Sequence, residues 1–390
     1  MTPAARVQAA IEILDQILGG AVAEQVLTNW GRQNRYAGSK DRQAIRDHVF
    51  DALRCKRSFG HLGGGADGRA IMIGACRAAG ADPVTIFTGE GHAPKPLSDA
   101  EMTAPPPLTA DAVGLDCPDW LWDRIGQSLG GDGRRTALSV LQTRAPVFLR
   151  VNLLRSTREA AIMALAKDDI QVVPHDTVET ALIVTENPRR IANSAAFADG
   201  LIELQDASSQ SACLHLGVKN GDRVLDYCAG GGGKSLALAA LGARVTSHDI
   251  DPQRMADLPV RAARAGTKVA VVRPQELAKS SESFDLVFCD APCSGSGTWR
   301  RTPDAKWRLA PDRLDQLTSI QRDVLEKAMT LVGPDGRLAY ATCSIFCEEN
   351  QDQTAAFVAR HPEFVMVQEQ IWQPTQDWDG FYLCVLTRRK

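Results

Sequence analysis

The sequence predicts an α/β protein whose largest part is a doubly wound, Rossmann-like domain. Three observations predict it. After residue 200, short apolar strands alternate with helical segments, and the first strand leads into a glycine-rich turn. The first 92 residues instead show helical periodicity with little strand signal. Alternation of strands and helices at this spacing is typical of a parallel sheet covered by helices on both faces.

The N-terminal region is predicted to be a separate helical domain over residues 1–92. VQAAIEILDQIL and SKDRQAIRDHVFDALR both place apolar residues at helical spacing. The stretch 91–118 is rich in proline and small polar residues, as expected of a linker. We therefore assign residues 93–139 to a linker and a connecting helix.

Residues 140–200 are predicted to form a small α/β subdomain, with strands at 147–152, 170–175 and 181–186 and a helix at 157–167. This leaves residues 201–390 for the large domain. Its strands are expected at 224–228, 244–250, 268–273, 284–290 and 336–343. The last segment, GFYLCVLTRR (380–389), is expected to add an edge strand.

Composition indicates a soluble globular chain of two or three domains. It has 390 residues, 44% hydrophobic and 23% charged, with a net charge of -3. No apolar stretch approaches the roughly 18–20 residues of a membrane span, and Glu12 and Asp15 interrupt the first apolar helix. We therefore expect a cytoplasmic protein with no membrane partner, and a monomer, since nothing indicates a coiled coil.

The ten cysteines show no CxxC spacing, so we expect reduced thiols rather than a disulfide framework. Cys343 and Cys347 are separated by three residues but lack matching histidines. No metal site is predicted.

The most conspicuous ligand site is the turn DYCAGGGGKS (226–235), where glycines let the backbone approach a ligand and a helix follows. A phosphate-binding P-loop requires glycine where this chain has Cys228. The dinucleotide pattern G-x-G-x-x-G fits only loosely.

A third interpretation of the turn is a nucleoside cofactor without a pyrophosphate, namely S-adenosylmethionine. An acidic residue at the end of the second strand would accept hydrogen bonds from the ribose hydroxyls. Asp249 is in that position, with Asp251 as the near alternative. Asp249 could instead cap a helix that begins near Pro252. The order of glycine turn and then acid favours the ribose role.

Two cysteines, Cys293 and Cys343, each follow a predicted buried strand. Because ligands bind outside the carboxyl ends of strands in open α/β sheets, both would reach the same crevice. A buried structural cysteine is the commoner alternative for any single thiol. The pair nevertheless suggests a thiol that attacks a base, because a thiolate is strongly nucleophilic and is also a good leaving group.

Basic residues occur in two clusters. The later one interleaves them with tryptophans, a combination suited to single-stranded nucleic acid. Its residues predicted to bind RNA are Arg300, Arg301, Lys306 and Trp307. The earlier cluster lies between Arg32 and Arg57. Each cluster taken alone is as consistent with a solvated face.

Residues 140–390 resemble the Sun/Fmu family of RNA cytosine carbon-5 methyltransferases, also called the RsmB-like or NOP/Sun group. ELQDASSQ, DYCAGGGGKS, DAPCSGSGTWRRTPDAKW and ATCS occur in the family's order. The resemblance implies a class I S-adenosylmethionine-dependent methyltransferase core preceded by a small RNA-binding subdomain. The N-terminus resembles the NusB-like domain of bacterial members through GSKDRQAIRDHVFDALR (38–54).

The resemblance also implies roles for individual residues. Cys343 matches the nucleophile and Cys293 the cysteine that assists product release. Asp290 would lie between cofactor and cytosine, and Asp249 would hold the ribose. The methionine part of the cofactor would be cradled by Cys228, Ala229, Gly230, Gly231, Gly232, Gly233 and Lys234.

The chain departs from the family in three places. Gly230-Gly231 replaces the usual Ala-Pro, which should loosen the turn. Gln275 stands where an acid is expected to help hold the adenosine, and the helical N-terminus is shorter than usual.

The sequence leaves open more than one substrate and more than one function. Small-subunit (16S) ribosomal RNA is the favoured substrate, with transfer RNA next. The other alternative is an RNA-binding or ribosome-assembly factor that has lost activity. An amino-methyltransferase is disfavoured, because the turn after the fourth strand is Asp290-Ala291-Pro292-Cys293 rather than Asn/Asp-Pro-Pro-Tyr.

Overall fold

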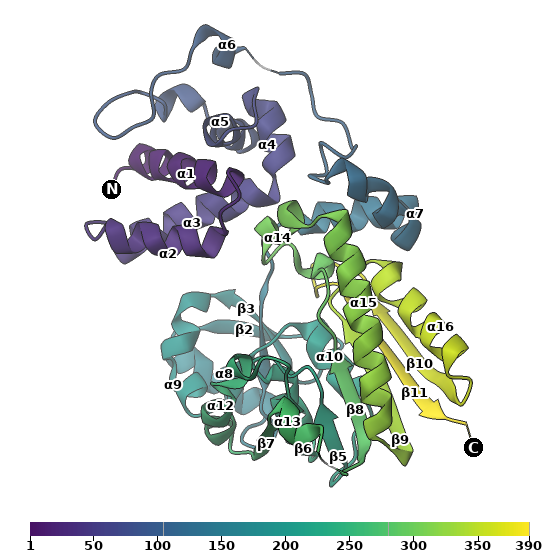
Figure 1. The fold of residues 1–390 in the computed structure, drawn as a ribbon. Coiled ribbons are helices and arrows are strands. Elements are labelled where there is room, and N and C mark those ends of the chain that lie inside the picture. The colour runs from purple at the N-terminus through teal and green to yellow at the C-terminus, as the bar shows by residue number, and fades with distance from the viewer. Residues whose placement is uncertain (104, 280, 390) are drawn as a thin grey trace. The chain divides into compact units, whose positions relative to one another are not determined.

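The computed structural model describes residues 1–103, 105–279 and 281–389. The chain divides into two compact units (Figure 1). The helical unit comprises residues 1–144 and 299–309, and the sheet unit comprises residues 145–298 and 310–390. Each is described by itself below.

The helical unit is built on five helices around one apolar core. They are α1 (Pro3–Leu18), α2 (Ala23–Gln33), α3 (Ser39–Arg54), α4 (Lys56–Gly63) and α5 (Gly68–Ala78). The side chains of Thr2 and Asp67 accept hydrogen bonds from the first turns of α1 and α5 and so cap them. The backbones of α4 and α5 cross closely, because a Cβ at Gly74 would lie only 1.8 Å from the Phe59 carbonyl oxygen. The predicted helical N-terminal region is therefore confirmed.

The rest of the helical unit is less regular. It holds η1 (Pro83–Thr85), α6 (Asp99–Met102) and α7 (Asp119–Leu141), which is interrupted at Gly130. The chain returns at residues 299–309 with α14 (Pro303–Arg308). Trp307 Nε1 donates to the Leu53 carbonyl at 2.7 Å, and Arg54 Nε donates to the Arg300 carbonyl at 2.7 Å. The sequence patterns did not predict that residues 299–309 belong to the helical unit.

The sheet unit begins with a four-stranded antiparallel sheet in the order β2-β3-β1-β4. Its elements are β1 (Val147–Val151), α8 (Arg158–Lys167), β2 (Gln171–Pro174), β3 (Ala181–Glu186), η2 (Pro188–Asn193), α9 (Ala195–Ala198) and β4 (Ile202–Leu204). The three strands and the helix expected before residue 200 are present. The fourth strand, β4, was missed because it has only three residues.

The large sheet has the order β10-β11-β9-β8-β5-β6-β7. Its strands are β5 (Arg223–Asp226), β6 (Arg244–His248), β7 (Val269–Val272), β8 (Phe284–Asp290), β9 (Val332–Thr342), β10 (Phe364–Trp372) and β11 (Phe381–Arg388). The five strands from β9 to β7 run parallel. The predicted Rossmann-like sheet is confirmed.

Helices cover both faces of this sheet (Figure 1). Leu238 and its neighbours on α10 and α11 pack on one face, whereas Leu325 of α15 and Phe357 of α16 pack on the other. The helical segments are α10 (Ala207–His215), α11 (Gly233–Ala240), η3 (Pro252–Met255), α12 (Leu258–Ala265), α13 (Pro274–Leu277), η4 (Ser296–Thr298), α15 (Pro311–Ala328), η5 (Met329–Leu331), η6 (Cys347–Glu349) and α16 (Gln351–Arg360).

The expectation of an edge strand at 380–389 was wrong. β11 lies between β9 and β10 and is antiparallel to both. Its residues Phe381–Leu386 are all buried, as suits an interior strand covered on both faces. β10 forms the edge, and its mixture of polar and exposed residues hid it from the sequence patterns.

All ten cysteines are free thiols. Over the residues that the structure describes, there is no group of three or more His, Cys, Asp or Glu side chains that could hold a metal ion. No helix in the same residues combines the length and apolar character needed to cross a membrane.

Candidate active site

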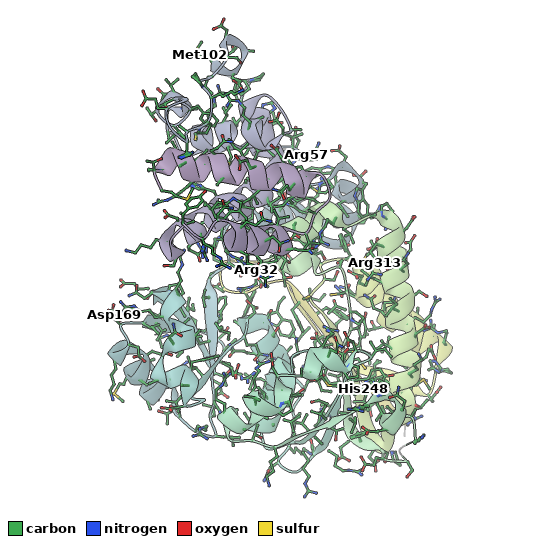
Figure 2. The ribbon with its side chains drawn as sticks, turned by 60° about the vertical axis from the view of Figure 1, so that its left-hand side comes forward. Arg32, Arg57, Met102, Asp169, His248 and Arg313 are labelled. Carbon is green, nitrogen blue, oxygen red and sulfur yellow. The ribbon has the colours of Figure 1, made fainter. Side chains whose placement is uncertain are left out.

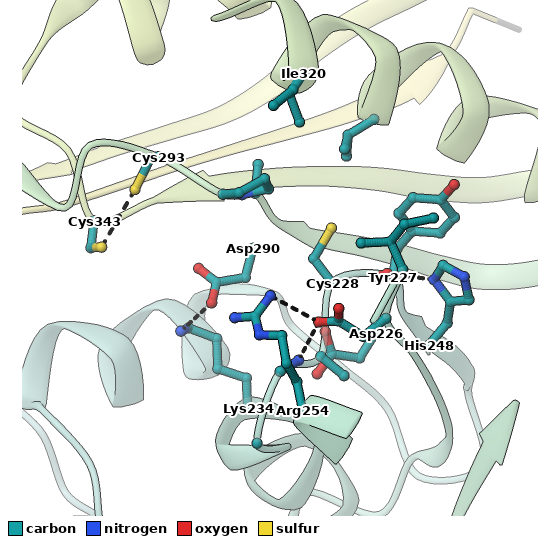
Figure 3. A pocket seen from close by; sticks show the side chains of 18 of the residues that line it. Asp226, Tyr227, Cys228, Lys234, His248, Arg254, Asp290, Cys293, Ile320 and Cys343 are labelled. Atoms are coloured by element: carbon teal, nitrogen blue, oxygen red, sulfur yellow. Dashed lines mark hydrogen bonds and ion pairs between the residues drawn. The ribbon is translucent and has the colours of Figure 1, made fainter. Parts of the chain in front are cut away.

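A cavity of about 800 Å³ opens at the carboxyl ends of β5, β6, β8 and β9 (Figure 3). This is where ligands bind in open α/β sheets. Most of the residues predicted to bind cofactor or to act in catalysis line it: Cys228, Ala229, Gly230, Gly231, Gly233, Lys234, Asp249, Asp290, Cys293 and Cys343. Gly232 does not line it but packs on Leu258, where a Cβ would lie 2.2 Å from Cδ1.

The glycine turn joins β5 to α11 through two left-handed residues, Gly230 at φ +52° and Gly232 at φ +78°. L-residues with side chains rarely adopt this conformation, so the glycines are required by the path of the chain. Ala229 N donates to the His248 carbonyl at 2.8 Å, which ties the turn to the end of β6. No side chain caps the N-terminus of α11.

Asp249 is almost fully buried behind this turn. One carboxylate oxygen accepts from Gly230 N at 2.9 Å and from Arg254 Nη1 at 3.2 Å, and the other accepts from Asp251 N at 3.0 Å. The helical turn that follows is capped by Asp251, whose side chain accepts from Gln253 N. The capping alternative for Asp249 is therefore excluded.

Asp226, at the end of β5, is fully buried in the floor of the cavity. Ser235 Oγ donates to its Oδ2 at 2.6 Å, whereas its buried Oδ1 has no hydrogen-bond partner among the residues that the structure describes. Burial, together with the nearby charge of Asp290, raises the pKa of Asp226 to about 7. A buried acceptor without a donor costs free energy, so Oδ1 is suited to accept a hydrogen bond from a ligand. The sequence analysis assigned this residue no role.

Asp290 and Lys234 form an ion pair, with 2.6 Å between Nζ and Oδ2 (Figure 3). Burial alone would lower the pKa of Lys234, but the charge and hydrogen bond of Asp290 outweigh it and raise that pKa above its ordinary value. Lys234 therefore stays an ammonium ion. The sequence analysis placed both residues at the site but did not anticipate their pairing.

Cys293 and Cys343 face each other, with 3.5 Å between their sulfur atoms (Figure 3). The hydrogen bond to Cys343 raises the pKa of Cys293 well above its ordinary value, and burial and the charges of Cys343 and Glu349 act in the same direction. Cys293 thus keeps its proton and can donate it to a Cys343 thiolate. The two thiols are chemically unequal although they touch.

Glu349 holds the loop that carries Cys293. This fully buried carboxylate accepts from Ser294 N at 2.8 Å, from Ser294 Oγ, and from Gln321 Nε2 at 2.9 Å. Tyr340 OH donates to the Glu349 carbonyl at 2.6 Å. The loop after β8 is therefore tied to the segment that follows Cys343. Glu349 was not predicted, because a glutamate six residues after a cysteine is not a recognisable sequence motif.

The turn that carries Cys343 is held in a similar way. Asn350 Nδ2 donates to the Ser344 carbonyl at 2.9 Å, and Thr342 Oγ1 donates to Asn350 Oδ1. Gly297 N donates to the Cys343 carbonyl at 2.9 Å. These bonds fix the separation of the two cysteines from both sides.

One wall of the cavity comes from α15 and was not predicted. Its lining residues are Arg313, Leu317, Ile320, Asp323, Val324 and Lys327. Figure 2 marks Arg313 on this helix and His248 at the end of β6. Gln275, which stands where the family has an acid, does not line the cavity. This one departure from the family therefore lies outside the site in this structure.

The predicted RNA-binding segment belongs to the helical unit and is partly buried there. Arg300 and Lys306 are 0% and 1% exposed, and RNA binding by this segment stays a prediction. Burial lowers the pKa of Lys306 to about 8. Trp307 is half-buried, with Lys56 Nζ 4.3 Å from the centre of its ring. Arg301 is also half-buried.

Comparison with known proteins places the chain in a family. Residues 213–384 match the model of the 16S rRNA methyltransferase RsmB/F, and residues 117–190 match the ferredoxin-like domain of RsmF/B-like methyltransferases. Ribosomal RNA small subunit methyltransferase B of Sodalis glossinidius is 36% identical over 271 residues, 67% of this chain and 62% of the relative. The chain belongs to the RsmB/F family.

A second RsmB/F relative, ribosomal RNA small subunit methyltransferase B of Yersinia pseudotuberculosis serotype O:1b (strain IP 31758), is 33% identical over 287 residues, 70% of this chain and 66% of the relative. The chain thus spans just under two thirds of the length of these two relatives. The resemblance to the Sun/Fmu group is confirmed.

Solved structures share the fold of this RsmB/F family member. The crystal structure of PH0851 matches with a TM-score of 0.78 and 26% identity, over 100% of this chain and 99% of that one. NSun6 from Pyrococcus horikoshii, solved with SFG, matches with a TM-score of 0.63 and 17% identity, over 70% of this chain and 98% of that one. The second likeness shows the fold alone.

Proposed function

We propose that this protein transfers a methyl group from S-adenosylmethionine to carbon 5 of cytosine in RNA, with 16S ribosomal RNA as substrate. The observation that carries the proposal is the pair of facing thiols, 3.5 Å apart, in the cavity lined by the glycine turn and Asp249. The names of the family model and of the relatives support RNA, and ribosomal RNA in particular.

The cavity suits S-adenosylmethionine. The unpartnered Oδ1 of Asp226 is an acceptor for the methionine ammonium group, and Asp249 offers carboxylate oxygens to the ribose hydroxyls. The glycine turn lets the backbone lie close to the methionine part. When bound, this cofactor supplies an electrophilic methyl group on a sulfonium.

Cys343 is the nucleophile in the proposed reaction. Its thiolate forms a bond to carbon 6 of cytosine, and the electron pair of the 5,6 double bond makes carbon 5 nucleophilic towards the methyl group. As the adduct forms, N3 takes a proton from solvent, and the Asp290 carboxylate, held by the ammonium group of Lys234, accepts a hydrogen bond from the N3–H.

Cys293 is the base that ends the reaction. While Cys343 is free, its hydrogen bond and charge keep Cys293 protonated. Once Cys343 is a neutral thioether, that influence disappears and the pKa of Cys293 falls. Cys293 can then release its own proton to solvent water and accept the one on carbon 5. The electron pair of the broken C–H bond restores the 5,6 double bond, and Cys343 leaves as a thiolate.

The proposal is tested by methyl transfer from labelled S-adenosylmethionine into unmodified 16S ribosomal RNA and transfer RNA, followed by nucleoside analysis. Label in 5-methylcytosine of ribosomal RNA, with wild type but not with Cys343→Ala, is the expected result. Label in transfer RNA alone would select that substrate instead. No label in either RNA, with tight RNA binding, would support the inactive RNA-binding factor.

The last two parts of the proposal concern the cellular location and the oligomeric state of the protein. Ribosomal RNA is a cytoplasmic substrate in bacteria, and we propose that the protein acts there as a monomer. Size-exclusion chromatography with light scattering checks the second statement.

A further inference from the structure

Two arginines from outside the glycine turn hold its backbone carbonyls. Arg261 Nη1, on α12, donates to the Gly231 carbonyl. Arg150 Nη1, on β1 of the small sheet, donates to the Gly233 carbonyl at 2.7 Å. Both carbonyls belong to the turn that lines the cavity, yet neither arginine lines the cavity itself.

Glu203 fixes Arg261 in this position. Glu203 lies on β4 of the small sheet and is 4% exposed. Its Oε2 accepts from Arg261 Nη2 at 3.0 Å, and its Oε1 accepts from Arg264 Nη2. The guanidinium of Arg261 therefore bridges the small sheet and the turn, whereas Arg264 contacts the same carboxylate without reaching the turn.

Arg150 is buried and makes no ion pair with a carboxylate within residues 1–103, 105–279 and 281–389. Its other Nη1 partner is Gln205 Oε1, and its Nε is buried without a partner. Burial lowers its pKa to about 10. Burying a charged guanidinium costs free energy unless it is hydrogen-bonded. The hydrogen bond to the Gly233 carbonyl explains why this side chain is buried here.

The turn requires such support. Gly230 to Gly233 are four consecutive glycines, which lose more conformational freedom on ordering than any other residue type. Because the peptide unit is planar, fixing the Gly233 carbonyl also fixes the direction of the Lys234 N–H in the same plane. Arginines that hold the carbonyls thus set the orientation of N–H groups in the turn.

We infer that Arg150 and Arg261 are positioning residues that hold the glycine turn in its cofactor-binding conformation. The small sheet thereby controls affinity for S-adenosylmethionine without contacting the cavity through these side chains. This inference rests on the proposed function, since it takes the turn to be the cofactor site. Hydrogen bonds from these two arginines, which lie outside the turn, restrict its backbone as a proline within the turn would.

The test measures the dissociation constant for S-adenosylmethionine by calorimetry in the full chain, without RNA. Arg261→Ala is expected to raise Kd by about tenfold, because a charge-assisted hydrogen bond that orders the turn is lost. With saturating cofactor, kcat stays within about twofold of wild type, because the reacting groups are untouched. Arg264→Ala is the matched control. It loses the same Glu203 partner but no contact with the turn, and its Kd should not change.

A rescue separates positioning from a general loss of structure. Gly231 does not have a positive φ, and within the described residues its N–H donates no hydrogen bond. Proline at this position would restrict the free turn. A Cβ at Gly231 lies 3.3 Å from Arg261 Nη1, a contact that Arg261→Ala removes. Gly231→Pro is therefore expected to restore Kd to within about threefold of wild type in the Arg261→Ala background.

The outcomes are distinct. If Arg261→Ala does not fold, Arg261→Lys replaces it in the test. This variant keeps the charge but reaches only one acceptor, so its Kd should rise above that of wild type by less than the roughly tenfold expected for alanine. An unchanged Kd in the folded Arg261 variant, or an equal rise in Arg264→Ala, would overturn the inference while leaving the proposed function intact. Failure of the wild type to bind S-adenosylmethionine would overturn both.

Discussion

The sulfur atoms of Cys293 and Cys343 lie 3.5 Å apart at the ends of two neighbouring parallel strands, β8 and β9. The hydrogen bond to Cys343 holds the pKa of Cys293 well above its ordinary value, so Cys293 keeps its proton. The distance fits sequential roles on one base.

Cys343→Ala is expected to lower methyl transfer by at least about 1,000-fold, because the proposed covalent bond to carbon 6 can no longer form. Binding of S-adenosylmethionine should persist, since the glycine turn and Asp249 are unchanged. Transfer of labelled methyl groups and calorimetry check the two statements. Cys347→Ala is the control, because Cys347 lies four residues away and does not line the cavity. Turnover at the wild-type rate in Cys343→Ala would contradict the mechanism.

Cys293→Ala is expected to accumulate a covalent protein–RNA adduct. Methylation proceeds, but the carbon-5 proton is not removed and Cys343 cannot leave. The adduct should appear on a denaturing gel as a slowly migrating, RNase-sensitive band. The double variant Cys293→Ala/Cys343→Ala should show none. Absence of the band in the single variant, with normal product release, would exclude Cys293 as the base.

Much of the fold was predictable because its strands carry strong local signals. β8 and β9 end in small polar turns, and β8 was predicted with its observed bounds, whereas β9 begins at Val332, four residues before its predicted start. β10 was missed because an edge strand lacks the apolar pattern of an interior one. The return of residues 299–309 to the helical unit depends on contacts with α3, such as that of Trp307 with Leu53, which no local pattern shows.

The site was predictable to the level of residue type and order. The glycine turn, Asp249, Asp290 and both cysteines were identified and line one cavity. The groups that support them were not, because Glu349, Asn350, Arg150 and Arg261 act through three-dimensional contacts with backbone or loop atoms. The burial of Arg300 was not predictable either, because sequence alone does not distinguish a packed guanidinium from an exposed one.

Glu349→Gln is expected to lower kcat for methyl transfer on the order of 10- to 100-fold, because the side chain would lose its charge and one of its two acceptor oxygens for Ser294. The Cys293 loop would then no longer be fixed relative to Cys343. Affinity for S-adenosylmethionine should be unchanged. Single-turnover kinetics with saturating cofactor measure the effect. The neighbouring Glu348→Gln is the control, because Ser294 and Gln321 donate to Glu349 rather than to Glu348. A kcat within twofold of wild type would remove Glu349 from its positioning role.

The contribution of Asp226 to the stability of the ligand-free protein is expected to fall as pH rises from about 4 to about 7, because its carboxyl ionises in the folded state. The pKa of this carboxyl is raised from 3.8 to about 7 by burial, so the folded protein holds a proton that the unfolded chain has already lost. The contribution is fully present below pH 3.8 and is lost as pH passes through the folded-state value. Its slope is roughly 1.4 kcal/mol per pH unit within that window.

Asp226→Asn isolates this contribution. The amide keeps the shape and carries no charge, so the variant should gain stability relative to wild type at pH 8 and show no gain at pH 4. Urea unfolding at several pH values measures the difference, and Asp251→Asn, at a more exposed position, serves as the control. The same change should weaken binding of S-adenosylmethionine, because a carboxylate is a stronger acceptor for an ammonium group than an amide oxygen is. Equal stability changes at both pH values would show that the Asp226 carboxyl does not titrate in this range. A gain in stability at pH 8 without weaker cofactor binding would keep the titration but remove Asp226 from the cofactor site.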